Sequence, residues 1–169
     1  MRFIVPASAL ALALLTVSSV SMGKKADSVI DARSAALAAQ GNTLIGEGKY
    51  GEAIDQLETA LAVDPKNRTA IILLARAADK QGLPGKAIRL YREALLIEPN
   101  DVMALSGQGE ALVQKGAMAR ARENLVKITK ICPTNCPEQT KLASVIEKAA
   151  STPVVSAEAV KPKPVVTQN

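Results

Sequence analysis

The sequence has 169 residues, of which 48% are hydrophobic, and a net charge of +5, so its length and composition suit one compact domain with a substantial core. It contains no histidine, which excludes an imidazole base, nucleophile partner or metal ligand, and we expect no cofactor and no metal site. The modest charge and scarce aromatic residues also predict no nucleic acid partner, because single-strand binders stack bases on aromatic side chains.

Residues 1–23 have the features of a secretory signal peptide. Arg2 gives a positive start, residues 9–17 are mostly Ala and Leu, and small residues lead up to Gly23. An uncleaved membrane anchor is the alternative, although the apolar run is shorter than the about 20 residues of a spanning helix. We expect an exported, soluble protein without an integral membrane span after signal removal. The periplasm is the favoured location, with secreted or signal-anchored forms as alternatives.

Three residue types recur every 34 residues in the next part of the chain. Residues 24–33 precede it as a linker or an extension of the first helix. Recurrence in phase is typical of a repeat array, whose units bury their apolar faces against each other. It divides the chain into units 34–67, 68–101 and 102–135. The recurring residues are Gly48, Gly82 and Gly116; Ala53, Ala87 and Ala121; and Pro65, Pro99 and Pro133.

Each unit is predicted to form two helices joined by a turn. Apolar or small residues follow three-and-four spacing on both sides of each recurring glycine, which suits the left-handed conformation that ends a helix. The recurring prolines stop the second helices. Gly41, Ala75 and Gly109 are small, and we expect them where two helices of one repeat touch.

Short segments of these units resemble the tetratricopeptide-repeat (TPR) family. The segments are Gly-Lys-Tyr-Gly-Glu-Ala-Ile at 48–54, Ala-Leu-Ala-Val-Asp-Pro at 60–65 and Ala-Leu-Leu-Ile-Glu-Pro at 94–99. The resemblance implies an all-α fold, a right-handed superhelical solenoid of three helix-turn-helix repeats. The third unit departs from the family pattern, because Arg122 and Thr129 replace apolar residues.

Residues 136–149 are predicted to form a C-terminal capping helix. Pro137 fits its first turn, and Leu142 and Ile146 share one face. Such a helix shields the open end of a repeat stack. Residues 150–169, rich in Pro, Val and Lys, show no helical period and are predicted to be a disordered tail.

Cys132 and Cys136 lie close together before the capping helix. In an exported chain, such a pair favours a disulfide, which here would gain about 2 kcal/mol from its small loop. A redox-active pair, free thiols or metal binding are the alternatives.

The resemblance implies that the first helices line a concave groove for a peptide or protein segment. Arg76 and Lys80 are four residues apart and leave one face of their helix. Family members that clamp chaperone tails use Lys and Asn residues, but Ala38 and Arg76 stand at two of those positions. The groove residues predicted to bind a partner are Asn42, Ile45, Thr69, Ile72, Arg76, Asp79, Lys80, Met103, Ser106 and Glu110.

Charge varies along the stack. The first unit has more acidic than basic side chains, whereas the second and third have more basic ones. Such a gradient could orient a partner or favour head-to-tail self-association; the alternative is that it serves solubility alone.

These observations predict a non-enzymatic protein-interaction scaffold of the bacterial cell envelope, an exported bacterial type of TPR protein. Its partners would be envelope proteins or peptides, as in the assembly of a pilus, secretion or outer-membrane machine. The alternative is a thiol-disulfide active protein that uses Cys132 and Cys136. The sequence offers no nucleophile with a base and no phosphate-binding loop, so we expect no enzyme.

Overall fold

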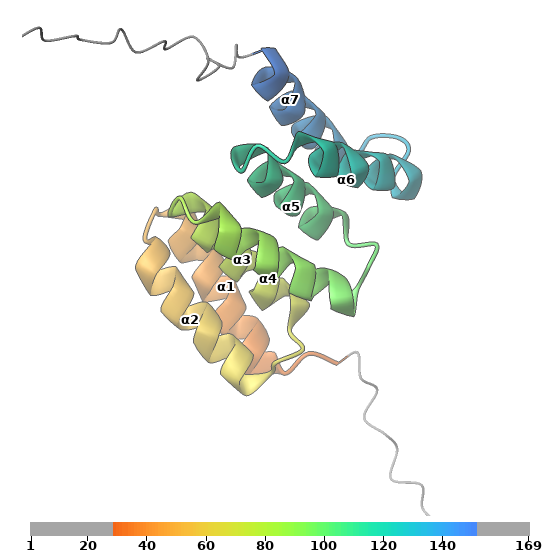
Figure 1. Ribbon diagram of the computed structural model, residues 1–169. Coiled ribbons are helices and arrows are strands. Elements are labelled where there is room, and N and C mark those ends of the chain that lie inside the picture. Colours follow the sequence, from red (N-terminus) through yellow and green to blue (C-terminus); the bar gives the residue numbers. More distant parts are fainter. Residues whose placement is uncertain (1–28, 152–169) are drawn as a thin grey trace, which may run out of the picture.

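The computed structural model describes residues 29–151, which form seven α-helices and no strand. The helices follow one another in a stack, with α1 and α7 at opposite ends (Figure 1). The prediction of an all-α helical repeat fold is confirmed. The predicted signal peptide and residues 152–169 of the predicted tail lie outside the described residues. The helices are α1 (Ala32–Gly46), α2 (Tyr50–Val63), α3 (Arg68–Lys80), α4 (Pro84–Ile97), α5 (Val102–Gln114), α6 (Met118–Ile131) and α7 (Pro137–Ser151).

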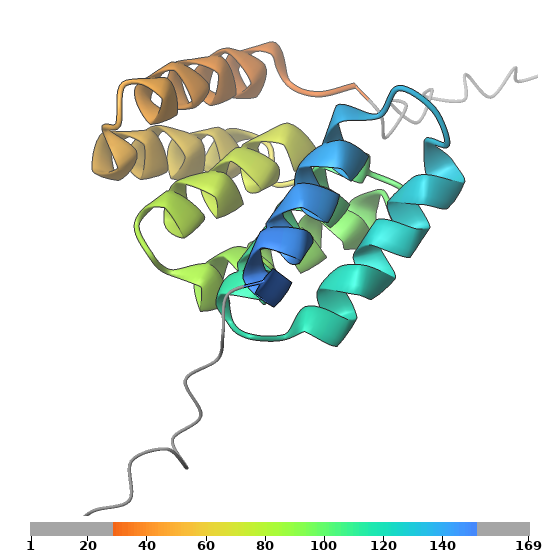
Figure 2. The ribbon, with the colours of Figure 1, turned by 90° about the horizontal axis from the view of Figure 1, so that it is seen from above.

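The helices are arranged in two layers. Helices α1, α3, α5 and α7 form the inner layer, in which each helix contacts the next one (Figure 2). The outer layer consists of α2, α4 and α6, which make no comparable contacts with one another. Because the inner helices touch and the outer ones do not, the stack curves toward the inner layer. The last helix, α7, continues the inner layer and packs on both α5 and α6.

The helix ends follow the recurring sequence signals. Asp31, Asn67 and Asp101 precede the first three inner helices, and each side chain accepts a hydrogen bond from a backbone N–H of the first turn. Gly48, Gly82 and Gly116 have φ angles of 76°, 75° and 74°. This left-handed conformation is the one predicted for them, and it turns the chain from each inner helix into the outer one. The outer helices end two residues before the recurring prolines.

Small residues allow close helix contacts, though not always between the helices that we expected. A Cβ atom at Gly41 would lie 2.6 Å from Cγ of Leu57, which belongs to the second helix of the same repeat. At Gly109 the corresponding neighbour is Leu142 of α7, at 2.6 Å from its Cδ2 atom. The prediction of a contact within one repeat was therefore wrong for Gly109, which instead makes room for the last helix.

The third repeat contains a buried polar cluster. Asn124 of α6 donates hydrogen bonds to the Leu105 carbonyl and to Gln108 Oε1, both at 3.0 Å. Gln108 in turn donates to the Ile88 carbonyl of α4 at 3.4 Å. Hydrogen bonding offsets the cost of burying these amides and links α4, α5 and α6. The polar residues noted in the sequence, Arg122 and Thr129, are exposed and take no part in this cluster.

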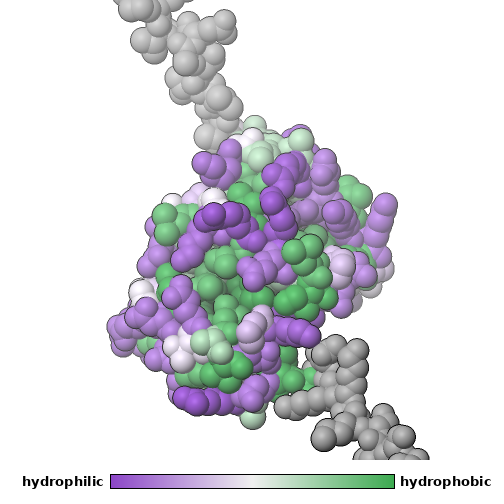
Figure 3. All heavy atoms as spheres, turned by 60° about the horizontal axis from the view of Figure 1, so that its bottom comes forward, coloured by the Kyte–Doolittle hydropathy of each residue, from purple (hydrophilic) through white to green (hydrophobic). Residues whose placement is uncertain are grey.

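The surface is mixed in character. Figure 3 shows hydrophobic side chains concentrated in the middle of one face and hydrophilic ones around them. Within residues 29–151, no helix is both long and apolar enough to cross a membrane.

Candidate binding groove

Two adjoining hollows run along the inner layer. The N-terminal hollow, of about 420 Å³, lies over α1, α3 and the start of α5. The C-terminal hollow, of about 270 Å³, lies between α3, α5 and the start of α7. Arg76 and Met103 line both hollows, so the two form one continuous groove on the concave side of the stack.

Nine of the ten predicted groove residues line this groove. Asn42 and Thr69 lie in the N-terminal hollow, and the other seven lie in the C-terminal hollow or in both. Ile45 is the exception, because it is 5% exposed and packs in the first hydrophobic cluster. Its side chain packs among core residues of α1, α2 and α3 rather than facing the groove. The seven predicted residues that line the C-terminal hollow or both hollows are Ile72, Arg76, Asp79, Lys80, Met103, Ser106 and Glu110.

The start of α7 forms one wall of the C-terminal hollow through Pro137, Glu138 and Lys141. We predicted residues 136–149 only as a cap and did not expect them in the groove. The repeat order could have predicted this role of residues 137–141. A helix that follows the third repeat occupies the place of the next inner helix, so its first turns face the groove.

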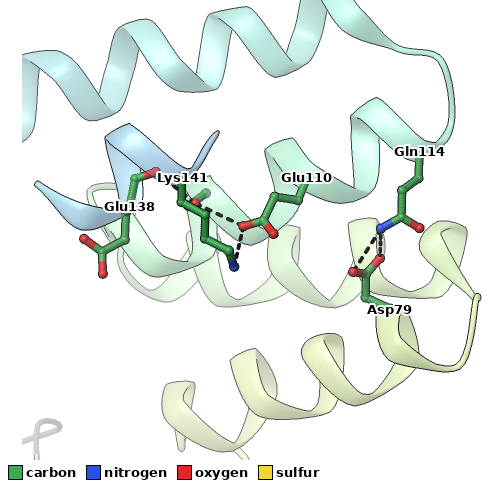
Figure 4. Close-up of polar contacts among 6 residues, drawn as sticks. Asp79, Glu110, Gln114, Glu138 and Lys141 are labelled. Carbon is green, nitrogen blue, oxygen red and sulfur yellow. Dashed lines mark hydrogen bonds and ion pairs between the residues drawn. The ribbon is translucent and has the colours of Figure 1, made fainter. Parts of the chain in front are cut away.

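Polar contacts hold α7 against α5 (Figure 4). Lys141 Nζ lies 2.9 Å from Glu110 Oε1, which also accepts a hydrogen bond from the Ser106 hydroxyl at 3.3 Å. The same hydroxyl lies 3.2 Å from the Glu138 carbonyl oxygen and can donate to it. The carboxylate of Glu110 is therefore already neutralised and hydrogen-bonded inside the protein.

Asp79 is also engaged internally. Gln114 Nε2 of α5 donates to both carboxylate oxygens of Asp79 on α3, at 3.0 and 3.1 Å (Figure 4). Partial burial raises the pKa of Asp79, and the hydrogen bond from Gln114 opposes that rise. This contact closes the far end of the groove between α3 and α5.

The cationic side chains of α3 contrast with these carboxylates. Arg76 and Lys80 are exposed, and neither makes an ion pair or a hydrogen bond within residues 29–151. Met103 lies beside Arg76 at the junction of the two hollows and is 54% exposed. The groove therefore presents two positive charges that form no ion pair, next to an apolar side chain.

Tyr91 reaches the groove from the outer layer. It belongs to α4 and is only 4% exposed, yet it lines the C-terminal hollow beside Gly107. Burial raises the pKa of its hydroxyl, as do the nearby carboxylates of Asp79 and Glu110. The reach of Tyr91 depends on the absence of a side chain at Gly107, a relationship that helical periodicity does not reveal.

Cys132 and Cys136 are free thiols in the structure, in place of the predicted disulfide. Cys136 is buried at the start of α7 and donates to Glu138 Oε2 at 3.8 Å, and Cys132 faces the Thr134 carbonyl at 3.9 Å. A hydrogen bond with Cys136 raises the pKa of Cys132 to about 11. A thiol held in its protonated form is a poor nucleophile at neutral pH. The described residues contain no group of three or more His, Cys, Asp or Glu side chains that could hold a metal ion.

The fold is that of a helical-repeat protein with a groove along its inner layer. The family model of the tetratricopeptide repeat matches residues 44–101. The chain is also 32% identical over 97 residues to the Cell division cycle protein 27 homolog of Caenorhabditis elegans. That alignment covers 57% of this chain and 12% of the relative, so the chain spans only a small part of that protein.

Solved structures of TPR domains share the fold. The TPR domain of Sgt2 from Aspergillus fumigatus has a TM-score of 0.65 at 20% identity, over 82% of this chain and 90% of that one. The first TPR domain of Spaghetti (RPAP3), bound to an HSP90 peptide, has a TM-score of 0.63 at 23% identity, over 70% and 94%. The Yersinia enterocolitica secretion chaperone SycD, in complex with a peptide of the translocator YopD, has 0.61 at 21%, over 69% and 91%. The family match and the shared fold support a tetratricopeptide-repeat protein.

Proposed function

We propose that the protein is a non-enzymatic scaffold that binds an extended segment of a partner protein in its concave groove. The observation that carries the proposal is the continuity of the two hollows through Arg76 and Met103. A continuous groove along four inner helices suits an extended chain better than a small compact ligand. RPAP3 and SycD, which share the fold, are each bound to a peptide, and this supports a peptide-binding function.

The groove chemistry favours a segment that combines apolar and polar residues. Ile72 and Met103 provide apolar surface, while Arg76 and Lys80 provide unpaired positive charge. Although the first TPR domain of RPAP3 is bound to an HSP90 peptide, Ala38 and Arg76 stand here where the resemblance implies residues that clamp chaperone tails. We therefore propose a partner segment other than a chaperone tail.

We further propose that the protein is exported and acts in the bacterial cell envelope, with the periplasm as its location. The support for export is the signal-like pattern of residues 1–23. Assembly of a pilus, secretion or outer-membrane machine is the role that we propose there. Fractionation of the source cells tests the location: recovery in the periplasmic fraction, without residues 1–23, supports it, and recovery with the cytosol contradicts it.

The thiol-disulfide alternative has less support. Its chemistry requires a stabilised thiolate, whereas the pKa of Cys132 is raised to about 11 by its hydrogen bond with Cys136. The groove therefore remains the favoured functional site.

A pull-down from an extract of the source cells tests the scaffold function. The bait is the protein, compared with the double variant Arg76→Glu and Lys80→Glu. The matched control is Arg89→Glu and Arg92→Glu, which makes the same charge change at exposed positions of α4 that do not line the groove. We expect partners to be lost with the groove variant and retained with the control, at equal helix content by circular dichroism. Equal recovery with all three proteins would contradict binding in the groove.

A further inference from the structure

Within the proposed binding groove, we propose that the C-terminal hollow is a subsite for an acidic side chain of the bound segment. Tyr91, Arg76 and Lys80 would bind its carboxylate, and Gly107 would be a positioning residue that admits Tyr91. The inference rests on the proposed function and goes beyond it, because it specifies which residue chemistry the partner segment must carry.

The Tyr91 hydroxyl is the first observation. The side chain is 4% exposed, so nearly all of it is packed between helices, and it makes no hydrogen bond within residues 29–151. Although it has no partner, the hydroxyl is not among the fully buried polar groups of the described residues. It is therefore accessible from the C-terminal hollow, which Tyr91 lines. Buried tyrosine hydroxyls usually find a hydrogen-bond partner, and here the open side faces the groove.

Gly107 is the second observation, because it creates the space that Tyr91 occupies. A Cβ atom at this position would lie 2.6 Å from Cε1 of Tyr91 and closer still to its hydroxyl end. Even alanine would therefore collide with the outer part of the ring. The glycine lets a residue of the outer layer present its hydroxyl on the concave surface.

The distribution of partnered and unpartnered charges is the third observation. Of the acidic groups that line the hollow, Glu110 is paired with Lys141, Asp79 accepts from Gln114, and Glu138 accepts from the Cys136 thiol. In Figure 4 the Glu138 carboxylate also points away from the other labelled carboxylates. Arg76 and Lys80 have no such partners.

The polar side chains of the C-terminal hollow that have no hydrogen-bond or ion-pair partner within residues 29–151 are therefore two cations and a hydroxyl. A guanidinium, an ammonium and a phenolic O–H all donate hydrogen bonds, and a carboxylate accepts them. Ile72 and Met103, which line the same hollow, would contact apolar residues beside the acidic one. The geometry points to an internal Asp or Glu flanked by apolar residues.

Paired peptide arrays test this inference. The probes are acetylated and amidated octapeptides of Ala, Leu and Ser, each made once with a central Glu and once with Gln in its place. Binding of the labelled protein is measured for each pair. We expect the Glu member to bind about tenfold more strongly, the size of effect that one or two charge-assisted hydrogen bonds give.

Variants of the subsite residues test whether the preference for Glu over Gln peptides arises in the C-terminal hollow. Tyr91→Phe keeps the packed ring and removes only the hydroxyl, so we expect it to fold normally and to lose much of the Glu preference, as should Arg76→Gln. Thr69→Trp, which fills the N-terminal hollow without adding charge, should weaken both members of each pair and leave their ratio unchanged. Gly107→Ala should displace Tyr91 and reduce the ratio.

The outcomes separate the two proposals. Equal binding of Glu and Gln peptides, still weakened by Thr69→Trp, would overturn the acidic subsite and leave the scaffold function standing. A Glu preference that survives Tyr91→Phe and Arg76→Gln would also overturn the subsite. Absence of any binding that responds to Thr69→Trp would overturn the proposed groove and the subsite with it.

Discussion

Asn67 donates a hydrogen bond from Nδ2 to the Ser34 hydroxyl oxygen at 2.8 Å, and both side chains are almost fully buried, at 1% and 0% exposed. The Ser34 hydroxyl in turn donates to the Ala60 carbonyl at 2.7 Å. Asn67 also caps α3, because its Oδ1 accepts from the backbone N–H of Ala70 at 3.1 Å. This chain of bonds ties α1, α2 and α3 together and fixes how the second repeat sits on the first.

Ser34→Ala should destabilise the protein by about 1 to 3 kcal/mol, because the Asn67 amide and the Ala60 carbonyl each lose a buried partner. Urea denaturation measures the loss. Ser144→Ala is the matched control, since Ser144 is exposed on α7. If both variants lose equally little stability, the buried bonds do not join the repeats as described.

Gly46→Ala and Gly48→Ala should have opposite effects on stability. Neither glycine has an atom within 4 Å of the place where a Cβ would stand, but Gly48 has a φ of 76°. Alanine at Gly48 should therefore cost about 1 kcal/mol for the left-handed backbone, whereas at Gly46, in α1, it should be neutral or slightly stabilising. Thermal denaturation of both variants checks this. Equal melting temperatures would contradict the role assigned to Gly48.

Asp79 should make the stability depend on pH. Because burial raises its pKa, the folded protein holds the proton more tightly than the unfolded chain does. Below the pKa of Asp in the unfolded chain, about 4, this proton stabilises the folded protein fully. The stabilisation is lost as pH rises through the pKa of Asp79 in the folded protein. Relative to Asp79→Asn, the unaltered protein should thus become less stable as pH rises from acid to neutral. Denaturation series of both proteins measure the difference, and parallel curves would contradict it.

Cys132 should react slowly with iodoacetamide at neutral pH. Its hydrogen bond with Cys136 raises its pKa to about 11, from an ordinary value of 9.0. The rate of alkylation should therefore keep rising beyond pH 10, and Cys136→Ala should shift the profile to lower pH. Mass spectrometry gives both rates, and after denaturation without reduction it should find two alkylated cysteines. A rate that levels off near pH 8, or a bridged pair, would contradict the description of this loop.

Periodicity explains why much of the fold could be predicted. The recurring glycines and prolines act through local backbone conformation, so their positions alone predict where helices end, as Gly48 shows. Three-and-four spacing likewise identifies Leu57, Leu105 and Leu142 as core residues. These features depend on residues near in sequence, whose relative positions a helix determines.

The groove was predicted less completely, because parts of it depend on contacts between distant segments. Ile45 was assigned to the groove, but the rotation of α1 that buries it follows from packing on α2. Tyr91 reaches the groove only because Gly107, on another helix, has no side chain. Lys141 joins it because α7 continues the inner layer. None of these relationships follows from the periodicity of a single helix.

Site-specific photocrosslinking tests most directly whether the concave groove is the binding surface. A photoreactive amino acid is placed either at Met103, 54% exposed in the groove, or at Leu96, 80% exposed on the outer helix α4. Both are exposed apolar positions, so they differ mainly in the face on which they lie. The groove account predicts a crosslinked partner from Met103 that Leu96 does not capture and that the Arg76→Glu and Lys80→Glu changes abolish. The same partner captured from Leu96 alone would contradict it.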